Sequence, residues 1–153
     1  MPGSYQMNLA TKQWAVKDKK RLLLAMMEAL AGDAHISFEG DLHGFRLMQI
    51  AGASDQETTT LKRNIHWPKQ DFAVVPLEPE IIQSVLPAIG GNVPHRFLHI
   101  QIEKNGHFEF AAYDQFHPEC IVFGRAISRD LIDEPVFNGV LKHERARPTT
   151  SPT

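Results

Sequence analysis

The chain has 153 residues, of which 42% are hydrophobic and 22% charged, a composition typical of one folded domain and not of a disordered protein. Sixteen basic and eighteen acidic side chains give a net charge of -2 at pH 7, so the overall field is too weak to hold nucleic acid without specific contacts. These values argue against two independent domains and against a strongly basic nucleic-acid-binding protein.

Cysteine content and hydropathy indicate the compartment. Cys120 is the only cysteine, which rules out an internal disulfide and a multi-cysteine zinc site and suits a reducing environment. We interpret it as a structural thiol, because the three-residue spacing from His117 is common and nonspecific. The longest apolar run, residues 22–27, is far too short to span a bilayer. We therefore expect a cytoplasmic protein.

The first element expected in the chain is a helix over residues 18–31. Its apolar residues recur at helical spacing, and Gly32 follows as a stop signal. Residues 1–13 before it are expected to form a leader outside the domain. The period-two pattern of residues 35–39 predicts a strand, and the apolar stretch 45–50 after a turn predicts its hairpin partner.

The middle of the chain continues with strands and a helix. Residues 58–64 are polar and β-prone and predict an edge strand, which leaves pairing with a second copy as a homodimer open. Residues 71–77 predict a strand that Pro76 ends. Pro79 and its acidic neighbours then begin a helix whose apolar side continues toward Gly90.

Two alternating runs around Asn105-Gly106 predict a β-hairpin over residues 97–113, the most informative feature of the sequence. A two-residue loop would place Ile102 opposite Glu109, so the apolar faces would not match. We therefore expect a three-residue loop with Gly106 in a bulge. This register predicts the pairs Ile102–Phe108, Ile100–Phe110 and Leu98–Ala112.

The remaining elements are short. Residues 121–123 predict a strand, and Ser128 caps a helix that Pro135 interrupts. Residues 144–153 have the composition of a disordered tail. The domain is thus expected to span residues 14–143. Its element order predicts an α+β fold with a single antiparallel sheet of about six strands and helices packed mainly on one face.

The hairpin has one polar face, which we interpret as an outward surface of the sheet. It combines carboxylates with aromatic side chains in the segment that follows, as protein interfaces do. Such a surface can occupy a basic cleft of a partner. The expected partner-binding residues are His99, Glu103, Glu109, Tyr113, Asp114, Phe116 and Glu119.

The sequence contains no P-loop, Rossmann fingerprint, nucleophile elbow or zinc-protease motif. We therefore expect no catalytic residue and no cofactor, and a protein that is not an enzyme. The alternative is a small metal-dependent hydrolase, because imidazoles and carboxylates alternate along the same hairpin. Its metal ligands would be His95, His99, Glu103 and His107.

A further alternative is a nucleic-acid-binding regulator. Lys62 and Arg63 with Trp67 combine cations with an aromatic ring, which is the chemistry of base stacking and phosphate contact. The strand-borne aromatic pattern of RNA-recognition domains is missing, and the net charge is weakly negative. We therefore expect no direct contact with nucleic acid and none with membranes.

Two stretches carry a resemblance to a class of proteins. Residues 35–42 and 108–117, the second containing Tyr113-Asp114-Gln115-Phe116, resemble the small cytosolic immunity proteins encoded beside bacterial polymorphic or contact-dependent growth inhibition toxins. The likeness lies in size, α+β layout and a hairpin followed by a Tyr-Asp-x-Phe segment. It implies binding of one cognate protein toxin, often a nuclease, which is neutralised by covering its active site or by docking beside it. These proteins share no universal functional motif, so the resemblance assigns no residue roles.

Overall fold

The computed structural model describes residues 12–137 and 139–145. The strands and α-helices are β1 (Lys12–Val16), α2 (Lys19–Leu30), β2 (Ala34–Gly40), β3 (Asp71–Pro76), α3 (Ile82–Ala88), β4 (Phe97–Lys104), β5 (His107–Ala112), β6 (Ile121–Phe123), α4 (Arg129–Phe137) and β7 (Leu141–Arg145). Short 3-10 helices occur at Leu47–Gln49 (η1), Pro79–Ile81 (η2) and Pro118–Cys120 (η3).

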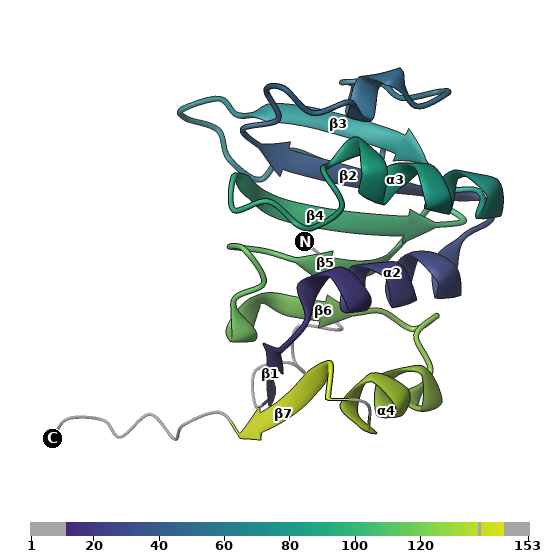
Figure 1. The fold of residues 1–153 in the computed structure, drawn as a ribbon, viewed down its shortest axis with the longest axis vertical. Coiled ribbons are helices and arrows are strands. Elements are labelled where there is room, and N and C mark those ends of the chain that lie inside the picture. Colours follow the sequence, from purple (N-terminus) through teal and green to yellow (C-terminus); the bar gives the residue numbers. More distant parts are fainter. Residues whose placement is uncertain (1–11, 138, 146–153) are drawn as a thin grey trace, which may run out of the picture.

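The main sheet has five antiparallel strands in the order β3-β2-β4-β5-β6, and β1 pairs with β7 in a separate two-stranded sheet. Helices α2 and α3 lie over the same face of the main sheet, and α4 lies beside β7 (Figure 1). The expected α+β class with helices mainly on one face is confirmed. The strands form two sheets instead of a single sheet of about six.

Helix α2 forms where the apolar spacing predicted it and is fixed at both ends. The Asp18 side chain accepts a hydrogen bond from the Arg21 N–H at 3.0 Å, which is an N-terminal cap. At the other end the Lys104 Nζ donates to three carbonyl oxygens, those of Leu30, Ala31 and Gly32, at 3.0, 3.1 and 2.7 Å. A cation there satisfies unpaired carbonyls and complements the helix dipole, so the cap ties α2 to the hairpin.

The main core lies between the helices and one face of the sheet. Helix α2 contributes Leu22, Leu23, Met26, Met27 and Leu30, all buried. Alternate residues of the strands meet them, so that Ile36 pairs with Ile102 and Phe38 pairs with Ile100. Phe97 packs edge-on against the rings of Phe38 and Phe45, with ring centres 5.6 and 5.0 Å apart. This face is the apolar layer that the alternation predicted.

Two strands expected before β3 are absent from the structure. Residues 45–50 form no hairpin with β2 and instead contain η1, while residues 58–64 are irregular. Strand β2 pairs with β3 and β4, and the outer edge of β3 bonds to Ser54 through Val74 N–H and C=O, at 2.7 and 2.9 Å. The expected edge strand at 58–64 is therefore wrong, because that segment crosses the sheet and does not extend it.

The hairpin register also differs from the prediction. Asn105 and Gly106 form a two-residue loop with φ of 52° and 76°, the two left-handed positions of a type I′ turn. Lys104 therefore pairs with His107, and the strands shift register between Ile102 and Glu103. The observed pairs are Ile102–Phe110 and Ile100–Ala112. Glu109 is the extra residue of a bulge in β5, and this bulge aligns the apolar faces of the two strands. The prediction had assigned the extra residue to the turn.

Both ends of the described chain form strands that the sequence analysis did not predict. Strands β1 and β7 pair residues 12–16 with 141–145, and each extends two residues beyond the expected domain limits. Helix α4 continues through Pro135, where an interruption was expected, and the Leu131 N–H donates to the Ser128 Oγ at 3.3 Å as predicted. The rest of the expected leader and tail lies outside the described residues.

Within residues 12–137 and 139–145, none of the helices combines the length and apolarity that crossing a membrane requires.

Candidate functional site

The second face of the main sheet is polar, as expected, but it is closed to solvent. The polar residues buried there or at its margin are Ser37, Glu39, His99, Gln101, Glu103 and Glu109, with exposed fractions between 0% and 8%. Residues 54–70, which we call the covering loop, pass over this face in the connection between β2 and β3. Leu61 of the loop is fully buried and packs with Phe72 and Val74 of β3 in a small second core.

Glu39 is the strongest attachment point of the covering loop. Its carboxylate is fully buried and accepts the backbone N–H of Asn64 at 2.8 Å and of Ile65 at 3.1 Å, one on each oxygen. Charge-assisted bonds to both oxygens satisfy a group that would be very unfavourable if left unpaired. The loop backbone is thereby held against the middle of the sheet.

Gln101 makes a second attachment and links the loop to β5. Its Nε2 donates to the Ser37 Oγ at 3.1 Å and to the Lys62 carbonyl at 3.0 Å. Its Oε1 accepts from the Tyr113 hydroxyl at 3.3 Å. Every polar atom of this buried amide therefore has a partner, so Gln101 acts as a structural connector and is not available to a ligand.

Glu103 and the hairpin turn fix the far part of the loop. The Thr58 hydroxyl donates to Glu103 Oε1 at 3.0 Å, and His35 Nδ1 lies 3.4 Å from the same oxygen. The Thr60 hydroxyl donates to the carbonyl of Gly106 in the turn at 2.9 Å. The covering loop is thus bonded to β2, β4 and the β4–β5 turn along its length.

The expected partner-binding set is therefore divided by the structure. His99, Glu103 and Glu109 are buried and hold neighbouring backbone or side chains, so the prediction that they form an outward docking face is wrong. Phe116 is also buried and packs in the core, with Lys19 Nζ 5.8 Å from the centre of its ring. The remaining members, Tyr113, Asp114 and Glu119, are half-buried or exposed.

Glu109 is internal because of the bulge that it occupies. Its carbonyl accepts the Gly124 N–H at 2.7 Å, and its carboxylate accepts the Ala126 N–H at 3.1 Å. A Cβ at Gly124 would lie 2.7 Å from the Glu109 Cα, so the two segments approach as closely as only glycine allows. Glu109 consequently anchors the segment after β6.

The residues of the alternative metal site are not brought together as ligands. His99 Nδ1 accepts the Asp114 N–H at 3.2 Å, Glu103 is engaged with Thr58 and His35, and His107 pairs with Lys104 beside the turn. His95 precedes β4 and is exposed. Over the described part of the chain, no three His, Cys, Asp or Glu side chains are placed to hold a metal ion.

Tyr113 and Asp114 belong to an unusual turn, and Glu119 follows it in η3. Asp114, Gln115 and Phe116 have φ of 49°, 58° and 65°, three consecutive left-handed residues without a glycine. Such residues each cost of order 1 kcal/mol and are maintained only when their surroundings fix them. We call residues 113–117 the left-handed turn. Strained backbone of this kind concentrates at functional sites, which makes the turn the main candidate for a binding surface.

Hydrogen bonds and ring contacts hold the left-handed turn against the residues at the start of β4. The His117 N–H donates back to the Tyr113 carbonyl at 3.2 Å, and the Tyr113 ring meets His99 edge-on at 5.4 Å between ring centres. The Gln115 N–H donates to the Leu98 carbonyl at 3.0 Å, and its side-chain amide donates to the His95 carbonyl. The buried Phe116 ring fixes the centre, so the exposed Asp114 is presented on a rigid support.

Cys120, at the end of η3, contacts the left-handed turn. Its thiol donates to Asp114 Oδ2 at 3.7 Å. Burial raises the pKa of the Cys120 thiol, and the charges of Asp114 and Glu119 raise it further. A thiol with a raised pKa is largely protonated near neutral pH and is a weak nucleophile, which agrees with its interpretation as a structural residue.

Replacing Asp114 with asparagine is expected to speed alkylation of Cys120 by iodoacetamide at pH 8 by about 3- to 10-fold. The substitution removes a negative charge that raises the thiol pKa, so the thiolate fraction rises. The rate is read by mass spectrometry of the intact protein. Glu119→Gln is expected to have a smaller effect and the distant Asp130→Asn none. An unchanged or slower rate in Asp114→Asn would contradict this electrostatic coupling.

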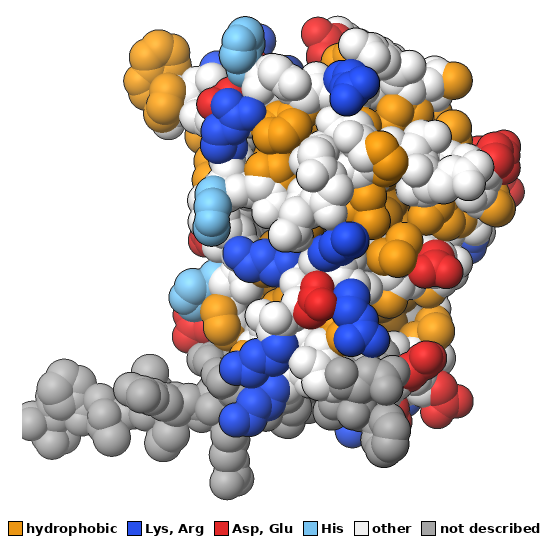
Figure 2. Space-filling view, in the orientation of Figure 1, with side chains coloured by type: hydrophobic (Ala, Val, Ile, Leu, Met, Phe, Trp, Pro, Cys, Tyr) orange, Lys and Arg blue, Asp and Glu red, His pale blue; other side chains and the backbone are white. Residues whose placement is uncertain are grey.

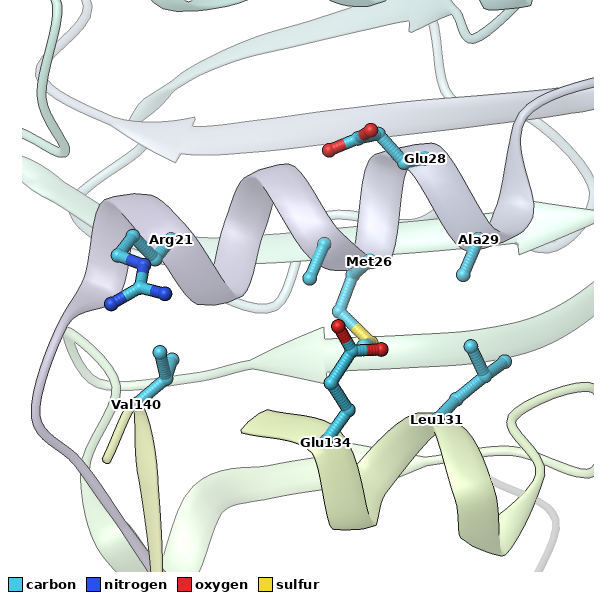
Figure 3. A pocket seen from close by; sticks show the side chains of 8 residues that line it. Arg21, Met26, Glu28, Ala29, Leu131, Glu134 and Val140 are labelled. Atoms are coloured by element: carbon cyan, nitrogen blue, oxygen red, sulfur yellow. The ribbon is translucent and has the colours of Figure 1, made fainter. Parts of the chain in front are cut away.

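A hollow of about 390 Å³ lies between α2 and α4, and none of the expected site residues lines it. In Figure 3 Arg21 and Leu131 stand at opposite ends, and Glu134 of α4 points toward Met26 of α2. Its lining side chains are Arg21, Ala25, Met26, Glu28, Ala29, Leu131, Glu134 and Val140. No histidine, cysteine or hydroxyl group is among them, so the hollow lacks a nucleophile paired with a base.

The covering loop is the feature that sequence reasoning missed. The signal for it was the 30-residue interval between β2 and β3, since connections longer than about 15 residues are uncommon in compact domains and usually have a role of their own. Trp67 of this loop has 87% of its surface exposed.

Comparison of the chain with models of known protein families, with curated proteins and with solved structures gives no match.

Proposed function

We propose that this protein is a non-catalytic binding protein of the cytoplasm, an immunity protein that neutralises a cognate bacterial toxin by occlusion. The toxin is proposed to be a nuclease domain. The observation that carries the proposal is the left-handed turn, in which three strained residues are fixed by surrounding contacts so that Asp114 is held outward. The resemblance in size, layout and Tyr-Asp-x-Phe segment supplies the class of partner.

The rigidity of the turn is the physical reason for this assignment. A segment that is already ordered loses little conformational entropy when a partner binds, so its contacts contribute more fully to affinity. Exposed carboxylates at Asp114 and Glu119 attract a positively charged surface and increase the association rate. A nuclease that binds phosphates presents such a surface, and a rigid acidic turn seated in it excludes the substrate.

The proposed contact surface is the left-handed turn and the residues beside it. The polar sheet face is filled by the covering loop, so the proposed contact lies at the end of the sheet where β5 leaves it, and not on the flat of the sheet. Of the predicted carboxylates, Asp114 and Glu119 remain as the proposed contact residues, because Glu103 and Glu109 are buried. Tyr113 contributes its half-buried ring at the margin.

The first test is whether the reading frame directly upstream encodes a toxin domain, and the second is whether this protein binds and neutralises that domain. Co-expression of the wild-type protein is expected to rescue growth, and titration calorimetry is expected to show one-to-one binding. The double variant Asp114→Lys/Glu119→Lys is expected to bind about 100-fold more weakly, because two attractive charges become repulsive.

The control is Glu28→Lys/Glu80→Lys, which makes the same change of net charge at exposed positions on α2 and η2. It is expected to bind within about 3-fold of wild type. Circular dichroism establishes that all variants are folded. Full toxicity in the presence of wild-type protein would refute the proposed function, whereas equal affinity of the two double variants would refute only the assigned surface.

A further inference from the structure

The side of α2 that faces away from the core combines charged and apolar residues. The five apolar residues of α2 named above fill its buried side. The opposite side, which we call the outer face, consists of residues three, four and seven positions apart, which share one face of a helix. They are Arg21, Leu24, Ala25 and Glu28. Arg21 and Glu28 are exposed, whereas Leu24 and Ala25 between them are half-buried. Surface helices usually have polar residues on this side, so the leucine at its centre is an exception.

The outer face is open and has a hollow on each side. Of the elements that the described residues form, none passes over α2 in Figure 1. The hollow of about 390 Å³ toward α4 is lined in part by Arg21, Ala25 and Glu28. A second hollow of about 620 Å³, toward η2 and α3, is lined in part by Leu24, Glu28 and Ile82. A ridge of side chains between two hollows is a surface against which another helix can pack.

Charge is segregated along α2. Its N-terminal end has four cations and one carboxylate, and its C-terminal end has four carboxylates and one cation on the helix or beside it. The first group is Lys17, Asp18, Lys19, Lys20 and Arg21, and the second is Glu28, Asp33, Glu78, Glu80 and Lys104. In Figure 2 the Lys and Arg side chains gather in the middle of the view, around the start of α2, and Asp and Glu side chains lie toward the right border.

This distribution of charge is the reverse of the one that stabilises a single helix. The first turn of α2 has no acidic residue and the last turn no basic residue, so the side-chain charges oppose the helix dipole at both ends. Arg21 and Glu28 are about 10 Å apart along the helix axis, too far to pair with each other. Neither takes part in an ion pair formed by residues 12–137 and 139–145, and Arg21 forms none with Glu134 across the hollow. One copy of the chain therefore leaves these charges uncompensated.

A second copy in antiparallel orientation has the complementary charges. A two-fold axis that crosses α2 between Leu24 and Ala25 places Arg21 of each copy opposite Glu28 of the other. The same axis sets the basic N-terminal end of each helix against the acidic C-terminal end of the other, where the helix dipoles are also opposed. We propose that the chain forms a homodimer through the outer face of α2. Leu24 and Ala25 of the two copies pack at its centre, and two reciprocal ion pairs between Arg21 and Glu28 flank them.

The dimer is expected to be weak and independent of the left-handed turn. A contact built on one helix face is small, and small interfaces form transient complexes, so the expected dissociation constant is about 10 to 100 µM. At low micromolar concentrations the protein is then monomeric, and neither toxin binding nor unfolding measured there depends on this contact. None of its residues belongs to the left-handed turn, so the inference goes beyond the proposed function and holds whether or not the partner is a toxin.

The test is sedimentation equilibrium of the wild-type protein from about 5 to about 500 µM, which is expected to show monomers and dimers in exchange. Arg21→Glu and Glu28→Arg are each expected to weaken the dimer by at least about 10-fold, because like charges then meet at both ion pairs. The double variant Arg21→Glu/Glu28→Arg exchanges the two charges and is expected to return to within about 3-fold of wild type. An equimolar mixture of the two single variants is also expected to associate, because each contact then joins opposite charges.

The control Lys62→Glu reverses the same charge at an exposed position of the covering loop, on the other face of the sheet. It is expected to dimerise within about 3-fold of wild type. Circular dichroism establishes that every variant is folded. A wild-type protein that stays monomeric at the highest concentration would overturn the proposal. Dimers that persist in both single variants, or that weaken equally in Lys62→Glu, would place the contact elsewhere and overturn it too, as would a double variant and a mixture that fail to recover association.

Discussion

Replacing Glu39 with alanine is expected to lower the free energy of unfolding by about 3 to 5 kcal/mol. The substitution removes a fully buried carboxylate that accepts hydrogen bonds from the backbone N–H groups of Asn64 and Ile65. Both N–H groups of the covering loop then lose this partner. Each charge-assisted hydrogen bond contributes about 1.5 to 3 kcal/mol, and an unsatisfied buried donor adds its desolvation cost. Urea unfolding followed by far-UV circular dichroism measures the change.

The same variant is expected to release the covering loop before the sheet unfolds. Trypsin should then cleave after Lys62 and Arg63 well below the denaturation midpoint, because their backbone leaves the surface of the sheet. Glu28→Ala, at an exposed carboxylate on α2, is the matched control and is expected to change stability by less than about 0.5 kcal/mol. Equal stability of Glu39→Ala and Glu28→Ala would show that the loop is not held by the buried carboxylate.

Replacing Gly40 with alanine is expected to cost about 3 kcal/mol or more and to disturb the end of β2 where the connection to the covering loop begins. Gly40 has a φ of 150°, and an added Cβ would lie 2.9 Å from the Leu98 N and 3.1 Å from the Phe97 Cα, with the Arg96 carbonyl closer still. All three atoms belong to backbone, so no side chain can move aside to make room.

Gly44→Ala separates the two causes of the stability loss expected for Gly40→Ala, which are steric overlap with neighbouring backbone and the strain of a positive φ. Gly44 also has a positive φ, of 85°, but an added Cβ there meets nothing within 4 Å. Its cost is therefore expected to be limited to backbone strain, about 1 kcal/mol. Thermal unfolding of both variants measures the difference. A Gly40→Ala protein as stable as Gly44→Ala would contradict the close approach of β2 and β4 at Gly40, where the register of the two strands shifts.

The helical face of the fold was predictable because local signals agree there. The apolar spacing of α2, its stop at Gly32 and the strand β3 all follow from residues that lie close together in the sequence. Strands β1 and β7 were not predictable in this way. Their partners are more than 120 residues apart, and neither short strand shows a local pattern that names the other.

The hairpin shows why register is harder to predict than pairing. Matching apolar faces required one extra residue, and two positions could supply it. The prediction placed it in the turn at Gly106, whereas the structure places it at Glu109. The side chain of Glu109 bonds to Ala126 and its carbonyl to Gly124, contacts from beyond β6 that the hairpin sequence alone does not reveal.

The polar face was recognised correctly as polar, but its surroundings were misjudged. Alternation along β2 and β4 shows which side chains share a face and does not show whether water or another segment covers them. Here the covering loop supplies backbone donors to Glu39 and a carbonyl to Gln101. The candidate binding surface consequently moves to the left-handed turn.

The polar face of the sheet is an internal layer, closed off by the covering loop. Hydrogen exchange of the backbone amides of Asn64 and Ile65 measures this closure, because each amide donates to the buried Glu39 carboxylate and the loop that carries them has no regular secondary structure. Both amides are expected to exchange at least about 100-fold more slowly than in an unstructured peptide. Exchange of these two amides at the unprotected rate would contradict it and return the polar face to solvent.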